Sequence, residues 1–132
     1  MMYASALLRD PAATYRQIDV AGRTATADGP ALVQLLYDEL VGALRAAAHA
    51  AEHGHYAAKS GRVTRATAIL FALEAGLDFD RGGEVSATLA RLYAGARATV
   101  LDAAMHNDPA PFRDTADTLA EIAGAWRTAR AA

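Results

Sequence analysis

Four amphipathic segments, separated by short runs of glycine, proline, aspartate and asparagine, limit what this chain can fold into. From residue 29 onward, apolar side chains recur every three or four residues, which is the spacing of one helix face. Apolar and polar residues never alternate with the period of two that a half-buried strand requires. Alanine, the residue with the highest helix propensity, fills many remaining positions. The pattern predicts an all-α fold.

The amino-terminal part of the chain lacks this pattern. Residues 1–27 form a weakly patterned leader, and residues 21–27 at its end are mostly small, as in a linker. After the linker, Asp28 is a good N-cap and Pro30 fits the first turn of a helix. We therefore expect a leader of residues 1–27 followed by a helical domain of residues 28–132.

Turn residues divide the helical domain into four helices. Gly54 is expected to stop the first helix, and Asp108 is expected to cap the fourth. Helix one is predicted over 29–53 and helix two over 57–77, followed by a turn over 78–83. Helix three is predicted to carry Val85 on its inner face and to end near Asn107, and helix four is predicted to begin at Asp108. Helices of five to seven turns with short connections predict an antiparallel four-helix bundle.

Composition excludes several classes of function. The chain has no cysteine, so it cannot form disulfides, a catalytic thiolate or a cysteine-ligated zinc site. Its net charge of −2 offers no broad attraction to nucleic acid or to an anionic membrane. Charged residues interrupt every apolar stretch before 18 residues, so we expect no membrane insertion. Arg9 and Asp10 break the first apolar run, which argues against a signal peptide and for a cytoplasmic protein.

Two histidine motifs suggest chemistry but have simpler explanations. His49 and His53 frame the string HAAEH, which matches the H-x-x-E-H motif of inverted zinc proteases. A third ligand and a cleft are not evident, however, and a histidine is favoured at the negative end of a helix dipole. His55, four residues before Lys59, resembles a phosphotransfer histidine but falls in a turn. We expect neither a catalytic site nor a bound metal or other cofactor.

Surplus apolar residues are the stronger functional signal. On helix one, Leu35 and Val41 project from other sides than the leucines that face the bundle. Helix two adds Ile69 and Phe71 outside its main stripe. These residues are either scattered surface side chains or a groove for an amphipathic partner helix.

Three stretches resemble one protein family specifically. Residues 32–38 read LVQLLYD, residues 77–93 begin LDFDRGGEV and end LY, and residues 119–126 read LAEIAGAW. Upstream, residues 15–20 read YRQIDV. In this order, these motifs are similar to those of the FliS family of flagellin export chaperones.

The resemblance implies a four-helix bundle that binds the disordered carboxy-terminal segment of flagellin, prevents its premature polymerisation and keeps it competent for flagellar type III secretion. It implies no catalysis and no cofactor. Components of the flagellar export gate are a second class of partner that fits such a protein. The alternative is a signalling module or homo-oligomeric adaptor with the same fold and no affinity for flagellin.

Apolar residues in the leader and in the first two helices are the predicted partner-binding residues. They are Tyr15, Ile18, Val20, Leu32, Leu35, Leu36, Val41, Ile69 and Leu73. We also expect the leader to occupy part of the groove when no client is bound. Three aromatic residues, Tyr37, Tyr93 and Trp126, are expected to pack in the core.

Overall fold

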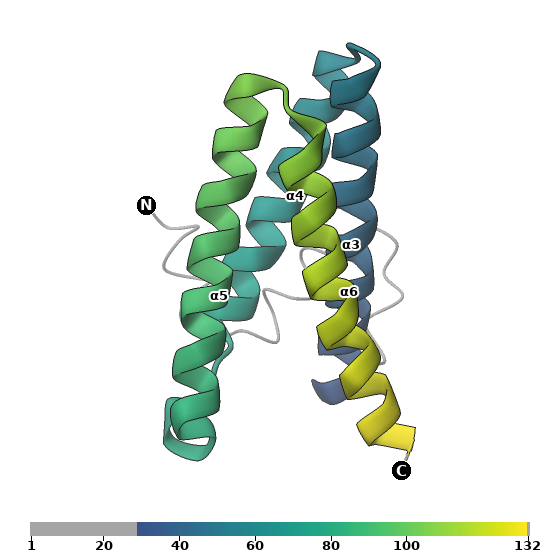
Figure 1. Ribbon diagram of the computed structural model, residues 1–132. Coiled ribbons are helices and arrows are strands. Elements are labelled where there is room, and N and C mark those ends of the chain that lie inside the picture. Colours follow the sequence, from purple (N-terminus) through teal and green to yellow (C-terminus); the bar gives the residue numbers. More distant parts are fainter. Residues whose placement is uncertain (1–28, 132) are drawn as a thin grey trace.

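The computed structural model describes residues 29–131 of the chain, which form four α-helices (Figure 1). They are α3 (Gly29–Glu52), α4 (Tyr56–Ala75), α5 (Phe79–His106) and α6 (Pro109–Ala131). α3 packs against α4 and α6, and α5 completes the ring by packing against the same two helices. Because short turns join them, successive helices run antiparallel. The predicted all-α four-helix bundle is confirmed, and the described residues contain no strand.

The leader lies outside the described residues. This applies to the linker over 21–27, to Asp28 and to the predicted binding residues Tyr15, Ile18 and Val20. The division of the chain after residue 27 therefore stays a prediction.

Most of the predicted helix ends are confirmed. Gly54 follows α3 with a φ of 72°, a left-handed conformation that glycine adopts without a steric penalty. Asn107 ends α5 in the same region, with a φ of 51°. Asp108 caps α6, and its Oδ1 accepts a hydrogen bond from the backbone N–H of Ala110 at 3.1 Å.

The segment over 78–83, predicted to be a turn, contains the first turn of α5. The side chain of Asp78 caps this turn by accepting the backbone N–H three residues later, and the helix is interrupted at Gly83, which has a φ of 48° and a ψ of −119°. The break changes which residues face inward. Ser86 is buried and its hydroxyl donates to the carbonyl of Asp78 at 2.8 Å, whereas Val85, predicted to face the core, is 66% exposed.

The core differs between the two ends of the bundle. Toward the α3–α4 and α5–α6 turns, buried alanines make up much of the core, together with Val63, Val100 and Phe112. Buried alanines there are Ala43, Ala47, Ala48, Ala51, Ala66, Ala103 and Ala116. Toward the other end, Tyr37, Tyr93 and Trp126 fill the space between α3, α5 and α6. α5 and α6 diverge toward that end, where α6 terminates (Figure 1). We call the two ends the alanine end and the open end.

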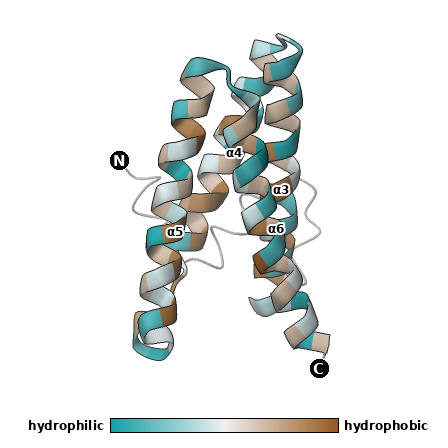
Figure 2. Cartoon of the chain, in the orientation of Figure 1, coloured by the Kyte–Doolittle hydropathy of each residue, from teal (hydrophilic) through white to brown (hydrophobic). Residues whose placement is uncertain are grey.

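Burial on α4 extends beyond the predicted stripe. Ile69, expected outside that stripe, is fully buried, because α4 packs against both α3 and α5. Phe71 remains partly exposed beside α5, with the guanidinium of Arg97 5.6 Å from its ring centroid. Hydrophilic and hydrophobic bands alternate along all four helices (Figure 2). Accordingly, none of the helices between residues 29 and 131 has the length and hydropathy needed to cross a membrane.

The only lysine of the sequence joins α4 to the end of α5. Lys59 is 8% exposed, and its ammonium donates to the backbone carbonyl of Ala104 at 2.8 Å and to the side-chain oxygen of Asn107. A cation is favoured at a helix carboxyl end, where carbonyls lack helical partners. Lys59 thus holds the alanine end of the bundle together.

Replacing Lys59 with methionine is expected to destabilise the protein by about 1.5–3 kcal/mol, the usual contribution of hydrogen bonds to a charged group. The substitution keeps the apolar stem and leaves the carbonyl of Ala104 without its donor. Urea unfolding followed by circular dichroism measures the change. Arg62→Met, at an exposed position on the same helix, is the matched control and should change stability by less than about 0.5 kcal/mol. Equal stability of the two variants would contradict the assigned role.

Candidate partner-binding site

A hollow with a volume of about 710 Å³ lies at the open end of the bundle. The first turns of α3, the α4–α5 turn and the last turns of α6 line it. Its lining residues are Gly29, Pro30, Val33, Gln34, Gly76, Asp78, Arg81, Trp126, Ala129 and Arg130. We call this feature the open-end hollow. It exists because α6 diverges from α5 at this end, so that the aromatic side chains do not close the bundle.

Gln34 gives the hollow a buried polar group with spare hydrogen-bonding capacity. Its side chain is 8% exposed, and Nε2 donates to the carbonyl of Ala123 on α6 at 3.3 Å. Its other polar atom, Oε1, has no hydrogen-bond partner within residues 29–131. An unsatisfied buried acceptor costs about 1–3 kcal/mol, so an N–H group that reached Oε1 after a local movement of the side chain would be stabilised there.

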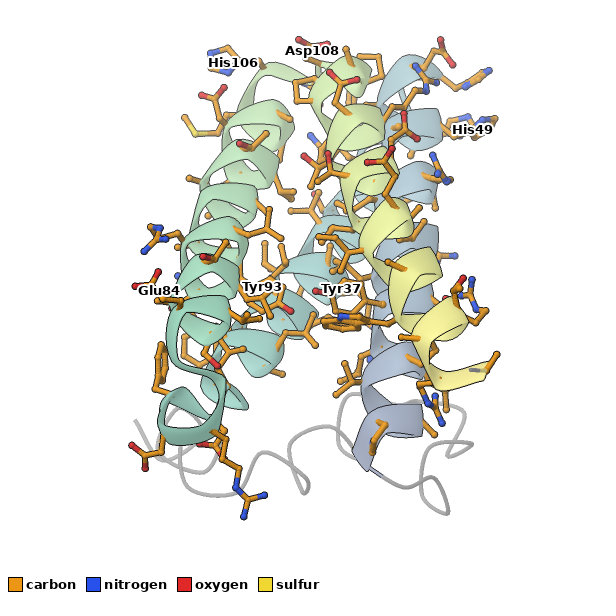
Figure 3. The ribbon with its side chains drawn as sticks, turned by 60° about the horizontal axis from the view of Figure 1, so that its bottom comes forward. Tyr37, His49, Glu84, Tyr93, His106 and Asp108 are labelled. Carbon is orange, nitrogen blue, oxygen red and sulfur yellow. The ribbon has the colours of Figure 1, made fainter. Side chains whose placement is uncertain are left out.

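Three aromatic residues separate the hollow from the core. The hydroxyls of Tyr37 and Tyr93 share a hydrogen bond, and their rings meet edge to face, with centroids 6.3 Å apart (Figure 3). The ring of Trp126 packs against that of Tyr37, with their centroids 4.7 Å apart, and Trp126 also lines the hollow. Burial raises the pKa of the Tyr93 hydroxyl, and the hydrogen bond from Tyr37 opposes that shift. The predicted core placement of these three residues is confirmed.

Charges are concentrated along the seam of α3 and α6. Three exposed salt bridges cross it, and each is worth at most about 1 kcal/mol in water. They are Asp38–Arg127 at 2.9 Å, Arg45–Asp117 at 3.0 Å and Glu52–Arg113 at 2.8 Å. No salt bridge joins α5 to α6 among the described residues, and a groove of about 300 Å³ lies between those helices.

Four of the predicted binding residues lie in the core. Leu32, Leu36, Ile69 and Leu73 are at most 4% exposed. They belong to the same core cluster as Tyr37, so a partner would reach them only if the helices moved. Leu32 and Leu73 nevertheless lie close in sequence to hollow-lining residues of α3 and of the α4–α5 turn. Their role in binding stays a prediction.

The other two predicted residues on α3 do not share a face. Leu35 is partly exposed, and Val41 is partly buried against the core. Six residues separate them, which places their side chains about 120° apart around a helix with 3.6 residues per turn. A single partner helix therefore cannot contact both through one face. The sequence did not point to Val33 and Gln34, which line the open-end hollow, because neither stands out from the helical pattern.

The histidines of the HAAEH motif lie exposed at the alanine end (Figure 3 labels His49). The rings of His49 and His53 are 4.1 Å apart, as their i, i+4 spacing predicts. Nδ1 of His53 lies 2.8 Å from the carbonyl of His49, to which it donates as an N–H. In the described part of the chain, no three histidine, cysteine or acidic residues are grouped so that they could hold a metal ion.

Residues 29–131 form a helical bundle with an open, largely apolar hollow at one end. In a comparison with known protein families, residues 11–132 match the family model described as Flagellar protein FliS. The chain belongs to the FliS family.

Two curated members of the FliS family match most of the chain. The flagellar secretion chaperone FliS of Salmonella typhimurium is 32% identical over 114 residues, which cover 86% of this chain and 84% of that protein. The flagellar secretion chaperone FliSB of Pseudomonas aeruginosa is 28% identical over 125 residues, covering 95% and 96%. The family resemblance expected from the sequence motifs is thereby confirmed.

The raised pKa of Tyr93 predicts loss of stability in alkali. Below pH 10 the residue is neutral in both folded and unfolded chains, so its contribution is constant. Above pH 10 the unfolded chain loses this proton first, and stability falls by up to about 1.4 kcal/mol per pH unit until the folded pKa is reached. Tyr93→Phe should remove this component from the pH dependence of urea unfolding. The exposed Tyr56→Phe is the control, and an identical alkaline slope in wild type and Tyr93→Phe would refute the assignment.

Proposed function

We propose that this member of the FliS family is a cytoplasmic export chaperone that binds the carboxy-terminal segment of flagellin. Binding would prevent premature polymerisation and keep the subunit competent for type III secretion. The observation that carries the proposal is the family match over residues 11–132, together with two relatives named flagellar secretion chaperones. Such a chaperone needs no catalytic residue, and we propose that the protein is not an enzyme.

The open-end hollow supports a docking role. Ligand sites are concave and mostly apolar, with a few polar groups that fix orientation. Val33 and Trp126 supply apolar lining, and Gln34, whose buried Oε1 lacks a hydrogen-bond partner within residues 29–131, adds a polar group to it. An amphipathic segment that is disordered when free gains structure only by burying its apolar side on a partner. We place part of the client interface at this hollow.

The purified full-length chain is expected to bind a peptide of flagellin's carboxy-terminal segment, form a one-to-one complex and delay filament assembly. Calorimetry at several temperatures should give a negative heat-capacity change, because apolar surface is buried. Val33→Arg should weaken binding at least about tenfold, since burying an unpaired charge costs more than 1.4 kcal/mol. Leu35→Arg separately tests the sequence-based prediction that Leu35 contacts the partner.

Ala58→Arg, an exposed substitution near the alanine end, is the matched control and should bind like the wild type. No binding by the wild-type protein at tens of micromolar would refute the proposed function and favour a signalling or adaptor module. Normal binding by Val33→Arg would instead remove the open-end hollow from the interface.

Removing residues 1–20 tests whether the leader competes with the client. The leader carries the apolar residues Tyr15, Ile18 and Val20, which the sequence predicts to bind the same groove. If it does so, apparent affinity is reduced by the fraction of molecules whose groove is occupied. Truncation should then speed client association in stopped-flow mixing. An unchanged or slower rate, with a lower melting temperature, would show that the leader is part of the folded bundle.

A further inference from the structure

The amino group of Lys59 is enclosed where α4 meets the end of α5. Its ammonium donates to the carbonyl of Ala104 at 2.8 Å and to the side-chain oxygen of Asn107, and it lies 5.4 Å from the centroid of the Tyr56 ring. An ammonium has three N–H donors, and here two oxygens and one aromatic face surround it. With the residue only 8% exposed, little of the amino group is left for a molecule from solution. We call these three contacts the lysine enclosure.

The lysine enclosure exists because of the way α5 ends. In a continuing helix, the carbonyl of Ala104 would accept the N–H of Asp108, but that N–H bonds instead to the carbonyl of Ala103 at 3.1 Å. Asn107 has a left-handed conformation at this point, and its side-chain oxygen lies beside the same ammonium. Lys59 therefore replaces the missing helical donor. The enclosure is lost whenever the last turn of α5 moves away from α4.

The enclosure decides what the amino group can react with. A lysine attacks an acyl donor only as the neutral amine, because the ammonium has no lone pair. In the folded bundle the nitrogen is held as a hydrogen-bonded ammonium and is shielded from solvent. No other side chain of the sequence offers an amine, since the remaining basic residues are arginines, which stay protonated in proteins, and histidines. The ε-amine chemistry of this chain therefore depends on one buried group.

We propose that Lys59 is a gated acylation site, closed in the folded bundle and open when the last turn of α5 separates from α4. Its substrates are acyl donors with an activated carbonyl, namely thioesters and acyl phosphates. In the open state the neutral nitrogen attacks the carbonyl carbon, and the bond from that carbon to sulfur or to phosphate oxygen breaks. The thiolate or phosphate leaves as an anion, and the nitrogen loses one proton to water. The product is an uncharged amide.

Acylation also prevents the site from closing again. The amide nitrogen has a single N–H and no charge, so it cannot satisfy both the carbonyl of Ala104 and the side-chain oxygen of Asn107, and it loses its cation–π contact with Tyr56. The acyl group must also fit into a buried position. The modification thus marks chains whose alanine end has opened, and it leaves folded chains unmarked.

Acetylation of the full-length chain with the N-hydroxysuccinimide ester of acetic acid, followed by peptide mass spectrometry, tests the closed state. Arg62→Lys supplies the matched reference, because this exposed position on the same helix places a second lysine in every molecule. In the folded protein, Lys59 should react at least about a hundredfold more slowly than the introduced lysine, which corresponds to an opening free energy of about 2.8 kcal/mol. In concentrated urea the two rates should become similar. Comparable rates in the folded protein would overturn the proposal.

Two variants test whether the opening is local. Asn107→Gly removes one acceptor and keeps the left-handed conformation without strain, so Lys59 should be acetylated about tenfold faster. Leu32→Val is a small core truncation at the open end, which lowers overall stability without opening the alanine end. It should leave the rate unchanged. An unchanged rate in Asn107→Gly, or an equal increase in Leu32→Val, would show that no local opening exposes the lysine. Circular dichroism verifies that both variants fold.

Melting curves test the effect of the modification itself. Wild-type protein that is acetylated in urea and then refolded should melt at a lower temperature than protein carried through urea without the reagent. Lys59→Met, which has no ε-amine, is the control for acetylation elsewhere in the chain and should melt at the same temperature with and without treatment. An unchanged melting temperature of the acetylated wild type would refute the inference that acylation keeps the site open.

Discussion

The contact of Tyr37, Tyr93 and Trp126 is the constraint on which the shape of the bundle depends. These side chains come from α3, α5 and α6, and they are too large for the helices to approach as closely as they do around alanine. The shared hydrogen bond satisfies both buried hydroxyls, so the bulky cluster carries little polar cost. The helices remain apart beyond it, and the open-end hollow lies there. A site for another molecule therefore follows from how the core is packed.

The alanine end stabilises the bundle, which allows the other end to remain open. There, buried alanines allow close packing and Lys59 ties α4 to the last turn of α5. The two ends are thus specialised: one supplies cohesion, and the other leaves apolar surface around the open-end hollow, with the unpartnered acceptor of Gln34 buried beneath it. Three exposed ion pairs keep the α3–α6 seam charged and hydrated.

Periodicity and helix caps were enough to predict the bundle, because Gly54, Asn107 and Asp108 act locally. The turn at 78–83 was mispredicted because the break depends on the backbone conformation of Gly83 and on the buried hydroxyl of Ser86. Surface assignments were weaker still. A helical stripe gives the direction of a side chain around its own axis, whereas exposure depends on how many helices surround it. Ile69 is buried for that reason. Leu101 and Met105, which the helical pattern does not single out, are exposed.

The different packing of the two ends also has a kinetic consequence. Backbone amides exchange with solvent through local openings, whose free energy rises with the number of packed neighbours. Near Lys59, an opening must break a buried charged contact and separate close-packed helices, while beside the hollow α6 can fray without disturbing that end. Deuterium uptake should therefore form a gradient along the bundle axis, slow at the lysine and fast at the carboxyl end of α6. The molecule can adapt its open end to a partner while the opposite end preserves the fold.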